Sequence, residues 1–280
     1  MRSELAELWL FRGLLWQLVR RDLKVRYKNS RLGFFWSIAP PLMQVAVITV
    51  VFKYATNFAK DVPSYSAYVL VAMIPWVFFQ TAILDSCDSI LKMYDVIRKV
   101  YMPREIIPLA SVLSNSIHFL ISWCVFFIYW WGFRGGPILP TALWLLYIIP
   151  VQVVLVTAIS LVVSCLNVFY EDIKYIVSIL MNVFFYLVPI IYIVEMLEVK
   201  NFGGNQYHAL VMFAYNLNPM TIIINGYRKA LLQPPMTNAF GTWIPLNSTG
   251  LLATGVFSLL ALVWSYGFFN RRKWRFVERP

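Results

Sequence analysis

The sequence predicts an all-α integral membrane protein with six transmembrane helices, an N-terminal amphipathic interface helix, and two short re-entrant helices between the fifth and sixth spans. The 280 residues are 60% apolar and only 13% charged, whereas a soluble domain has about 25% charged residues. This composition excludes an ordinary water-soluble enzyme, and its high hydrophobicity excludes a disordered chain. The 24 Lys and Arg residues are also distributed very unevenly along the chain.

Six largely uncharged stretches are long enough to cross a bilayer, which takes about 20 mostly apolar residues. The predicted spans are residues 34–54, 66–88, 106–132, 143–166, 175–195 and 250–270. A further apolar stretch at 209–227 contains Asn216, Asn218 and Pro219, which are costly at the bilayer centre unless protein or water surrounds them. We therefore expect residues 196–248 to form one outer segment that dips into the membrane and returns.

The basic residues predict the orientation of the chain. With six spans and a cytosolic N-terminus, the inner segments carry 18 Lys and Arg and the outer segments carry 6, as the positive-inside rule requires. A seventh span would place Arg271, Arg272 and Lys273 outside, against that rule. The net charge of +11 therefore indicates orientation and headgroup contact rather than a nucleic-acid partner.

Residues 1–32 are expected to form a cytosolic amphipathic helix and a basic connector, and residues 273–280 a cytosolic tail. The apolar side chains of this helix share one stripe: Leu5, Leu8, Trp9, Leu15, Trp16 and Val19. Charged residues interrupt the segment, so it does not resemble a signal peptide. The helix either lies on the inner membrane surface, with its Trp side chains at headgroup level and Arg12 snorkelling, or packs on the cytosolic face of the protein itself.

The sequence contains few signs of catalytic chemistry. It has no G-x-x-x-x-G-K-[ST] phosphate loop, and neither the isolated His118 and His208 nor the three scattered cysteines form a metal-ligand pattern. We expect no catalytic residue, metal or cofactor in this chain. Asp85 and Asp88 share a helix face; they could hold a divalent ion, form an acid–base pair, or lie at the solvated end of the second span.

Several short motifs together resemble the transmembrane (permease) subunit of type-2 ABC exporters of lipid-linked polysaccharide, the family of O-antigen, teichoic acid and capsule exporters. The motifs are Arg21-Asp22-Leu23-Lys24-Val25-Arg26-Tyr27-Lys28 running into Leu32-Gly33 and Trp36; Glu171-Asp172-Ile173-Lys174-Tyr175-Ile176; Pro189-Ile190-Ile191-Tyr192; and Asn218-Pro219-Met220-Thr221 with Arg228. The resemblance covers roughly Arg20 to Arg272. Pro40-Pro41 departs from it, since such proteins more usually have a polar residue before one proline.

The resemblance implies that residues 33–272 form a type-2 ABC transmembrane domain in a bacterial inner (plasma) membrane. Two copies would pair, each on a separate nucleotide-binding subunit that binds ATP and Mg, and would export a glycan on an undecaprenyl-type lipid through a channel between them. The chain would then be no enzyme. Two alternatives stay open: a membrane-embedded enzyme on lipid-linked sugars that uses Asp85 and Asp88, and a type-2 ABC subunit with a drug or lipid cargo.

The resemblance and the chemistry of the side chains give three groups of candidate site residues. Contacts that couple the chain to the ATPase are expected at Arg31, Leu32, Gly33, Arg98, Lys99, Tyr101, Arg104, Glu171 and Asp172. Aromatic faces that stack on sugar rings along the path are expected among Phe34, Phe35, Trp36, Trp76, Phe78, Phe79, Tyr186 and Tyr192. An outer gate is expected at Pro189, Asn218, Pro219 and Arg228.

Overall fold

The computed structural model describes residues 2–26, 35–55, 64–134, 140–192, 213–232 and 246–277. In these ranges the ordered elements are all helices. The elements are, in chain order, α1 (Arg2–Leu10), α2 (Arg12–Arg26), α3 (Phe35–Thr49), the π-helical η1 (Val50–Ala55), α4 (Tyr65–Lys92), α5 (Tyr94–Ile97), α6 (Ile106–Arg134), η2 (Pro140–Trp144), α7 (Leu145–Phe169), α8 (Ile173–Leu187), α11 (Pro219–Leu231), α13 (Ser248–Arg272) and η3 (Lys273–Val277).

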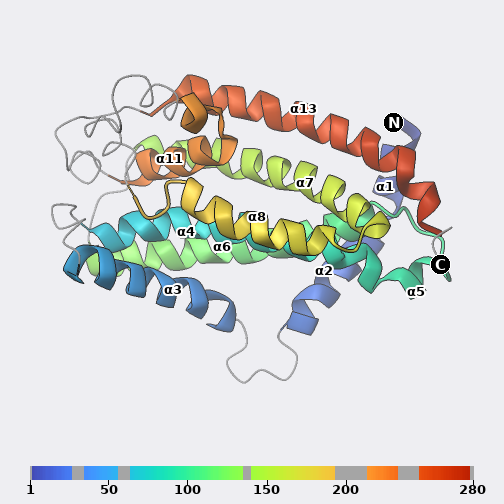
Figure 1. The fold of residues 1–280 in the computed structure, drawn as a ribbon, viewed down its shortest axis with the longest axis horizontal. Helices are drawn as coiled ribbons and strands as arrows, with labels where there is room; N and C mark the ends of the chain where they lie inside the picture. The colour runs from blue at the N-terminus through green and yellow to red at the C-terminus, as the bar shows by residue number, and fades with distance from the viewer. Residues whose placement is uncertain are drawn as a thin grey trace.

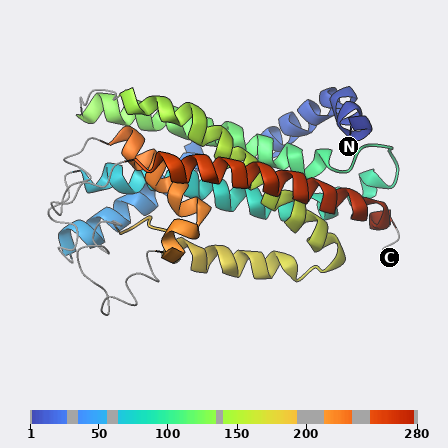
Figure 2. The same cartoon turned by 90° about the horizontal axis from the view of Figure 1, so that it is seen from above.

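Among the described residues, four helical segments are long and apolar enough to cross a membrane, and they run side by side in one elongated bundle (Figures 1 and 2). They cover Tyr65–Lys92, Ile106–Gly132, Pro140–Phe169 and Ser248–Phe276. These segments match the predicted second, third, fourth and sixth spans. The first and fifth predicted spans correspond to the shorter apolar helices Ala39–Ala55 and Ile173–Leu187, which fall below the usual length of about 20 residues.

Helix α4 is the centre of the bundle because it packs against α3, α6, α7, α8 and α11. Most of its side chains are buried, which explains its nearly continuous apolar sequence. Pro75 lies inside the helix and has no backbone N–H to donate. The buried Gln152 side chain of α7 donates a hydrogen bond to the Pro75 carbonyl at 2.7 Å, so a polar contact stabilises the helix at its proline.

The two ends of the bundle differ in the elements they carry. The chain's N- and C-terminal elements lie at the same end, together with α5 (Figure 1), which agrees with the predicted even number of membrane crossings. We call this the inner end, following the predicted orientation, and the end with α11 and η2 the outer end. A cluster of buried apolar residues closes the inner end; it includes Leu18 and Val19 of α2, Ile106 of α6 and Phe276 of η3.

The predicted amphipathic segment forms two helices, α1 and α2, which are separated at Phe11. Leu18 and Val19 are buried against the inner end of the bundle, whereas Trp9 and Trp16 are exposed. Helix α2 therefore packs on the protein's own inner end through one face, while Trp16 of α2 and Trp9 of α1 stay exposed. Contact of those side chains with a membrane surface stays a prediction.

The predicted outer segment contains α11, whose faces are buried against α4, α7 and α13. Residues 213–217 just before it are also helical. The rest of the predicted dip, residues 196–212 and 233–245, lies outside the described residues. Helix α11 is 13 residues long, too short to cross a bilayer, so it has the length expected of a re-entrant helix.

Candidate functional site

The predicted gate residues Arg228 and Pro189 are brought together at the outer end. The Arg228 guanidinium is buried and donates hydrogen bonds to the Pro189 carbonyl at 2.5 Å and the Ile190 carbonyl at 2.7 Å. It also lies 3.7 Å from the centre of the Tyr68 ring of α4. Nearby, the Tyr65 hydroxyl donates to the Ile191 carbonyl at 2.6 Å. One cation therefore ties α11 to α4 and to the segment after α8.

The other two predicted gate residues start helix α11. The Asn218 side chain accepts a hydrogen bond from the backbone N–H of Met220 at 3.0 Å, and Pro219 occupies the first helical turn. An Asn cap followed by Pro is a strong helix start because Asn accepts from one of the free N–H groups of the first turn and Pro has no N–H to satisfy. At the buried side of α11 the Tyr227 hydroxyl donates to the Gln152 side chain at 2.9 Å. Helix α11 is thus fixed at its first turn and along its buried face.

The predicted path aromatics have different environments. Trp76 and Phe79 are buried between α4 and α8, where their rings contact Phe184. Their faces are therefore inaccessible to a ligand in this conformation. Phe78 points the other way, toward α6, and stacks on Phe119 with ring centres 4.5 Å apart.

Two tyrosines of the same group lie near the outer end. The Tyr186 side chain is 70% exposed, so its ring is available to a partner or ligand outside this chain. The Tyr192 hydroxyl donates to the Leu187 carbonyl at 2.8 Å and also contacts the Tyr215 hydroxyl. Phe34 lies outside the described residues, and so do the side chains of Phe35 and Trp36.

The predicted coupling residues Arg98, Lys99 and Tyr101 are exposed at the inner end, after the short helix α5. The Tyr101 hydroxyl donates to the Glu7 carboxylate at 2.8 Å, which connects this loop to α1, and that hydrogen bond raises the pKa of Tyr101. Because Arg98 and Lys99 are exposed side by side, they form a basic surface at the inner end. Arg31, Leu32 and Gly33 lie outside the described residues.

Arg104, the fourth basic coupling candidate, contacts other residues of this chain instead of lying exposed on the surface. Its guanidinium donates to the Lys273 carbonyl and lies 5.9 Å from the Trp274 ring centre. Beside it, the buried Lys273 ammonium forms an ion pair with the buried Glu105 carboxylate at 3.2 Å. These contacts join the start of α6 to the end of α13, so the helices beneath the inner surface are fixed to each other.

Glu171 and Asp172, the acidic coupling candidates, are exposed in the tight turn between α7 and α8. The turn is held by Asn167, whose side chain donates to the Cys87 carbonyl and accepts from the backbone N–H of Lys174, both at 3.0 Å. Asn167 was not among the predicted coupling residues. Its buried amide fixes the place where α8 leaves the bundle.

The two carboxylates that could have formed a metal site bind different partners. Asp85 contacts Arg26 and Asn115, while Asp88 pairs with Lys174 at 2.7 Å and with Lys92 at 3.4 Å. Within the described residues no group of three His, Cys, Asp or Glu side chains comes together. The structure therefore gives no geometric support to a metal or acid–base centre at Asp85 and Asp88.

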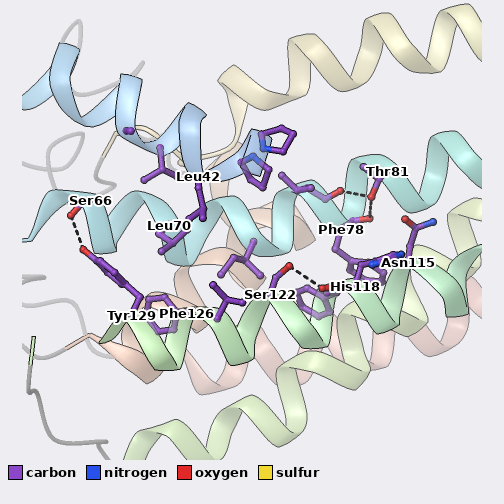
Figure 3. Close-up of a pocket in the computed structure, with 18 of the residues that line it drawn as sticks. Leu42, Ser66, Leu70, Phe78, Thr81, Asn115, His118, Ser122, Phe126 and Tyr129 are labelled. Carbon is purple, nitrogen blue, oxygen red and sulfur yellow. Dashed lines mark hydrogen bonds between the residues drawn. The ribbon is translucent and has the colours of Figure 1, made fainter. Parts of the chain in front are cut away.

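A cavity of about 660 Å³, not predicted from the sequence, lies between α3, α4 and α6 (Figure 3). Its middle is apolar, with Leu70 and Phe126 in its wall. Its outer end has the Ser66–Tyr129 hydroxyl pair at 3.2 Å. Its inner end has the Asp85, Asn115 and Arg26 contacts and His118. The cavity is thus a groove that runs along the length of α4.

A signal for this groove was present in the sequence. Polar residues recur at helical spacing in the otherwise apolar third span: Ser111, Ser114, Asn115, His118 and Ser122. Such a stripe marks the face of a membrane helix that lies against protein or a cavity. Arg26 could not be assigned to it, because its contact with α4 bridges 59 positions in the chain.

These helices and contacts define a multi-pass membrane protein. The family model described as "ABC-2 type transporter" matches residues 13–232. Two proteins of Klebsiella pneumoniae are 28% and 30% identical over 95% of this chain and 94% of their own length, and one of Myxococcus xanthus is 25% identical over 97% of both. Each of the three is named O-antigen export system permease protein RfbA. The chain belongs to the ABC-2 type transporter family.

Proposed function

We propose that this chain is the membrane-spanning subunit of an ATP-driven exporter of lipid-linked polysaccharide. It moves the glycan from the cytosolic to the outer face of a bacterial inner membrane, with six spans and both termini in the cytosol. The observation that carries this proposal is the similarity to three O-antigen export permeases, which extends over at least 94% of each relative. Similarity over nearly the whole length covers both the bundle and its inner surface.

The energy comes from two copies of a separate nucleotide-binding subunit. The sequence has no phosphate loop with which to bind ATP itself. At the inner end, exposed Arg98 and Lys99 offer positive charge, and exposed Glu171 and Asp172 offer negative charge. Paired charges on such a surface select a partner and its orientation, and the ties at Glu105 and Asn167 transmit force to the helices.

The path for the glycan lies between two copies of the chain. Side chains of α4 fill the centre of one bundle, so a polymer needs a second copy to enclose it. Helix α8 turns an apolar face outward, with Ile179, Val183 and Tyr186 exposed, and we assign the contact with the second copy to this face. Tyr186 then offers a ring for sugar stacking, and α11 with Arg228 closes the outer end as a gate.

Disulfide cross-linking tests the pairing. The native cysteines are first replaced, and Ile179→Cys is compared with Val263→Cys, an equally apolar and exposed position on α13. The full chain is co-expressed with its ATPase and oxidised in the membrane. A covalent dimer of the Ile179→Cys chain alone supports the proposed interface; equal cross-linking at both positions contradicts it.

Export itself is tested by deleting the gene and measuring surface polysaccharide. Loss of the surface glycan, with lipid-linked polymer retained inside and rescue by the intact gene, supports the proposed cargo. Normal surface glycan in the deletion strain, with altered export of a drug or a plain lipid, assigns the chain to another type-2 ABC cargo. Unchanged export in an Asp85→Asn, Asp88→Asn double variant argues against the enzyme alternative.

A further inference from the structure

Two adjoining cavities on the α4–α6 side of the bundle have the polarity of a lipid. The first is the groove described above. The second, which we call the inner chamber, has a volume of about 370 Å³, lies between α2, α4 and α6, and shares Arg26 and Asp85 with the groove. We propose that the two cavities together bind one zwitterionic bilayer phospholipid with an ethanolamine headgroup: the headgroup lies in the inner chamber and one acyl chain lies in the groove.

The groove has the width of a single hydrocarbon chain. Both Ser66 and Asp85 of α4 line it, so it extends over about 28 Å of helix, which is longer than the roughly 15 Å of hydrocarbon that one leaflet contributes and leaves room for an acyl chain that enters from its inner end. Its volume of about 660 Å³ over this length gives a mean width of about 5 Å. Since contacting carbon atoms lie about 4 Å apart, the groove admits one chain and leaves the second acyl chain to the bilayer.

The walls of the groove are chemically suited to a chain. Figure 3 places Leu42 of α3, Leu70 and Phe78 of α4, and Phe126 of α6 around it. The hydroxyls in its walls are already used: Thr81 donates to the Val77 carbonyl at 2.7 Å and Ser122 to the His118 carbonyl at 2.9 Å. An apolar occupant therefore leaves neither of these hydroxyls without a hydrogen-bond acceptor.

The inner chamber carries charges of both signs. Its lining includes the cations Arg21, Arg26 and Lys92 and the anions Asp22 and Asp85. A purely anionic headgroup would lie against the two carboxylates, and a purely cationic one against the three cations. A headgroup with one phosphate and one ammonium matches both sets, so charge complementarity favours a zwitterion.

The hydrogen-bonding state of the chamber favours a primary ammonium. Ser89 donates its hydroxyl proton to the Ser86 carbonyl at 2.7 Å, and Ser114 donates to the Ser111 carbonyl at 3.0 Å. Both hydroxyl oxygens are left as acceptors only. The Asp85 Oδ2 atom accepts from Arg26 and Asn115, whereas its Oδ1 atom accepts no hydrogen bond from the described residues. An ammonium supplies three N–H donors to such acceptors.

The phosphate has donors in the same chamber, from Lys92 of α4 and Arg26 of α2. Lys92 is largely exposed and forms an ion pair with Asp88 at 3.4 Å. Arg26 has five N–H groups. Two of its nitrogens donate to Asn115 and Asp85, and the remaining N–H groups can donate to a phosphate. The chamber lies at the inner end beside α2, and the groove leads from it toward the outer end. This polarity places the lipid in the inner leaflet.

Native mass spectrometry tests the proposal on the full chain with its ATPase. The complex is reconstituted in nanodiscs of equal parts phosphatidylethanolamine and phosphatidylglycerol, with a polyprenyl phosphate as competitor, and the lipids retained after detergent transfer are counted. We expect phosphatidylethanolamine to be retained. Ser122→Trp should fill the groove and abolish retention, whereas Leu120→Trp, on the exposed side of the same helix, should leave it unchanged.

A second pair of variants tests the groove independently, in case Ser122→Trp does not fold. Ala46→Phe obstructs the groove from α3, and its control Val47→Phe faces away from it. For the headgroup, Asp85→Asn removes the acceptor of the ammonium, and we expect the preference for phosphatidylethanolamine over phosphatidylglycerol to fall about tenfold, the ratio that one charge-assisted hydrogen bond supports.

Three results would overturn the proposal. The first is equal lipid retention in groove-filling variants and their controls. The second is retention of polyprenyl phosphate in place of the phospholipid, which would assign the groove to the export lipid. The third is an unchanged headgroup preference in Asp85→Asn. None of these readouts measures glycan export, so they are independent of the proposed function.

Discussion

Replacing Arg228 with Met should loosen the outer end of the bundle more than any other single change there. The substitution keeps an apolar stem but removes the donors to the Pro189 and Ile190 carbonyls, at 2.5 and 2.7 Å, and the cation above the Tyr68 ring. Two buried carbonyls without partners cost about 1–3 kcal/mol each, and a desolvated cation–π contact contributes about 2 kcal/mol. Since Met avoids burying a charge, we expect a net loss of about 3–5 kcal/mol.

Thermal stability in detergent provides the assay. The fraction of monodisperse protein after heating, followed by size-exclusion chromatography, should give an apparent Tm lower by on the order of 10 °C for Arg228→Met. Lys229→Met removes the same charge one residue further along α11 and serves as the matched control. Arg228→Lys should be intermediate, because one ammonium cannot reproduce the fork that meets two carbonyls. If Arg228→Met melts within about 2 °C of the control, the buried hydrogen bonds do not hold this region together.

Three further predictions concern other parts of the bundle. Glu105→Leu leaves the buried Lys273 ammonium without its carboxylate and should lower stability by about 3–5 kcal/mol. The double variant with Lys273→Leu should recover much of that loss. The same heating assay would refute this if the double variant melted no higher than the single one. Tyr227→Phe removes a buried hydroxyl donor and should cost about 1 kcal/mol, a fall of about 2–4 °C in Tm; an unchanged Tm would mean that the hydroxyl contributes nothing. Arg98→Glu with Lys99→Glu should change stability by no more than about 0.5 kcal/mol but abolish co-purification of the ATPase, and retained assembly would remove this surface from the coupling interface.

The long helices were predictable because each follows from local sequence. Continuous apolar runs define α4, α6, α7 and α13, and the Asn218-Pro219 pair marks the start of α11 on its own. The distribution of basic residues among the loops also predicts which end is the inner one, and this orientation stays a prediction. These features need no knowledge of which helices are neighbours.

Features that depend on the choice of neighbours were not predictable. Trp76 was a reasonable candidate for a sugar-stacking ring, yet α8 covers it; only the packing of α4 against α8 decides this. The groove likewise needs Arg26, Asp85 and Asn115, which come from three different helices. A single sequence indicates that such polar residues need partners, but it does not indicate which partners they meet.

Arg228 recognises main-chain oxygens at positions 189 and 190 rather than side chains. Every amino acid supplies the same carbonyl, so the residue identities at those two positions are free to drift in evolution as long as the chain follows the same course. Covariation between position 228 and this segment should therefore be weak even though the contact is tight. An aligned set of homologues would then show an invariant arginine whose partner escapes any statistical search.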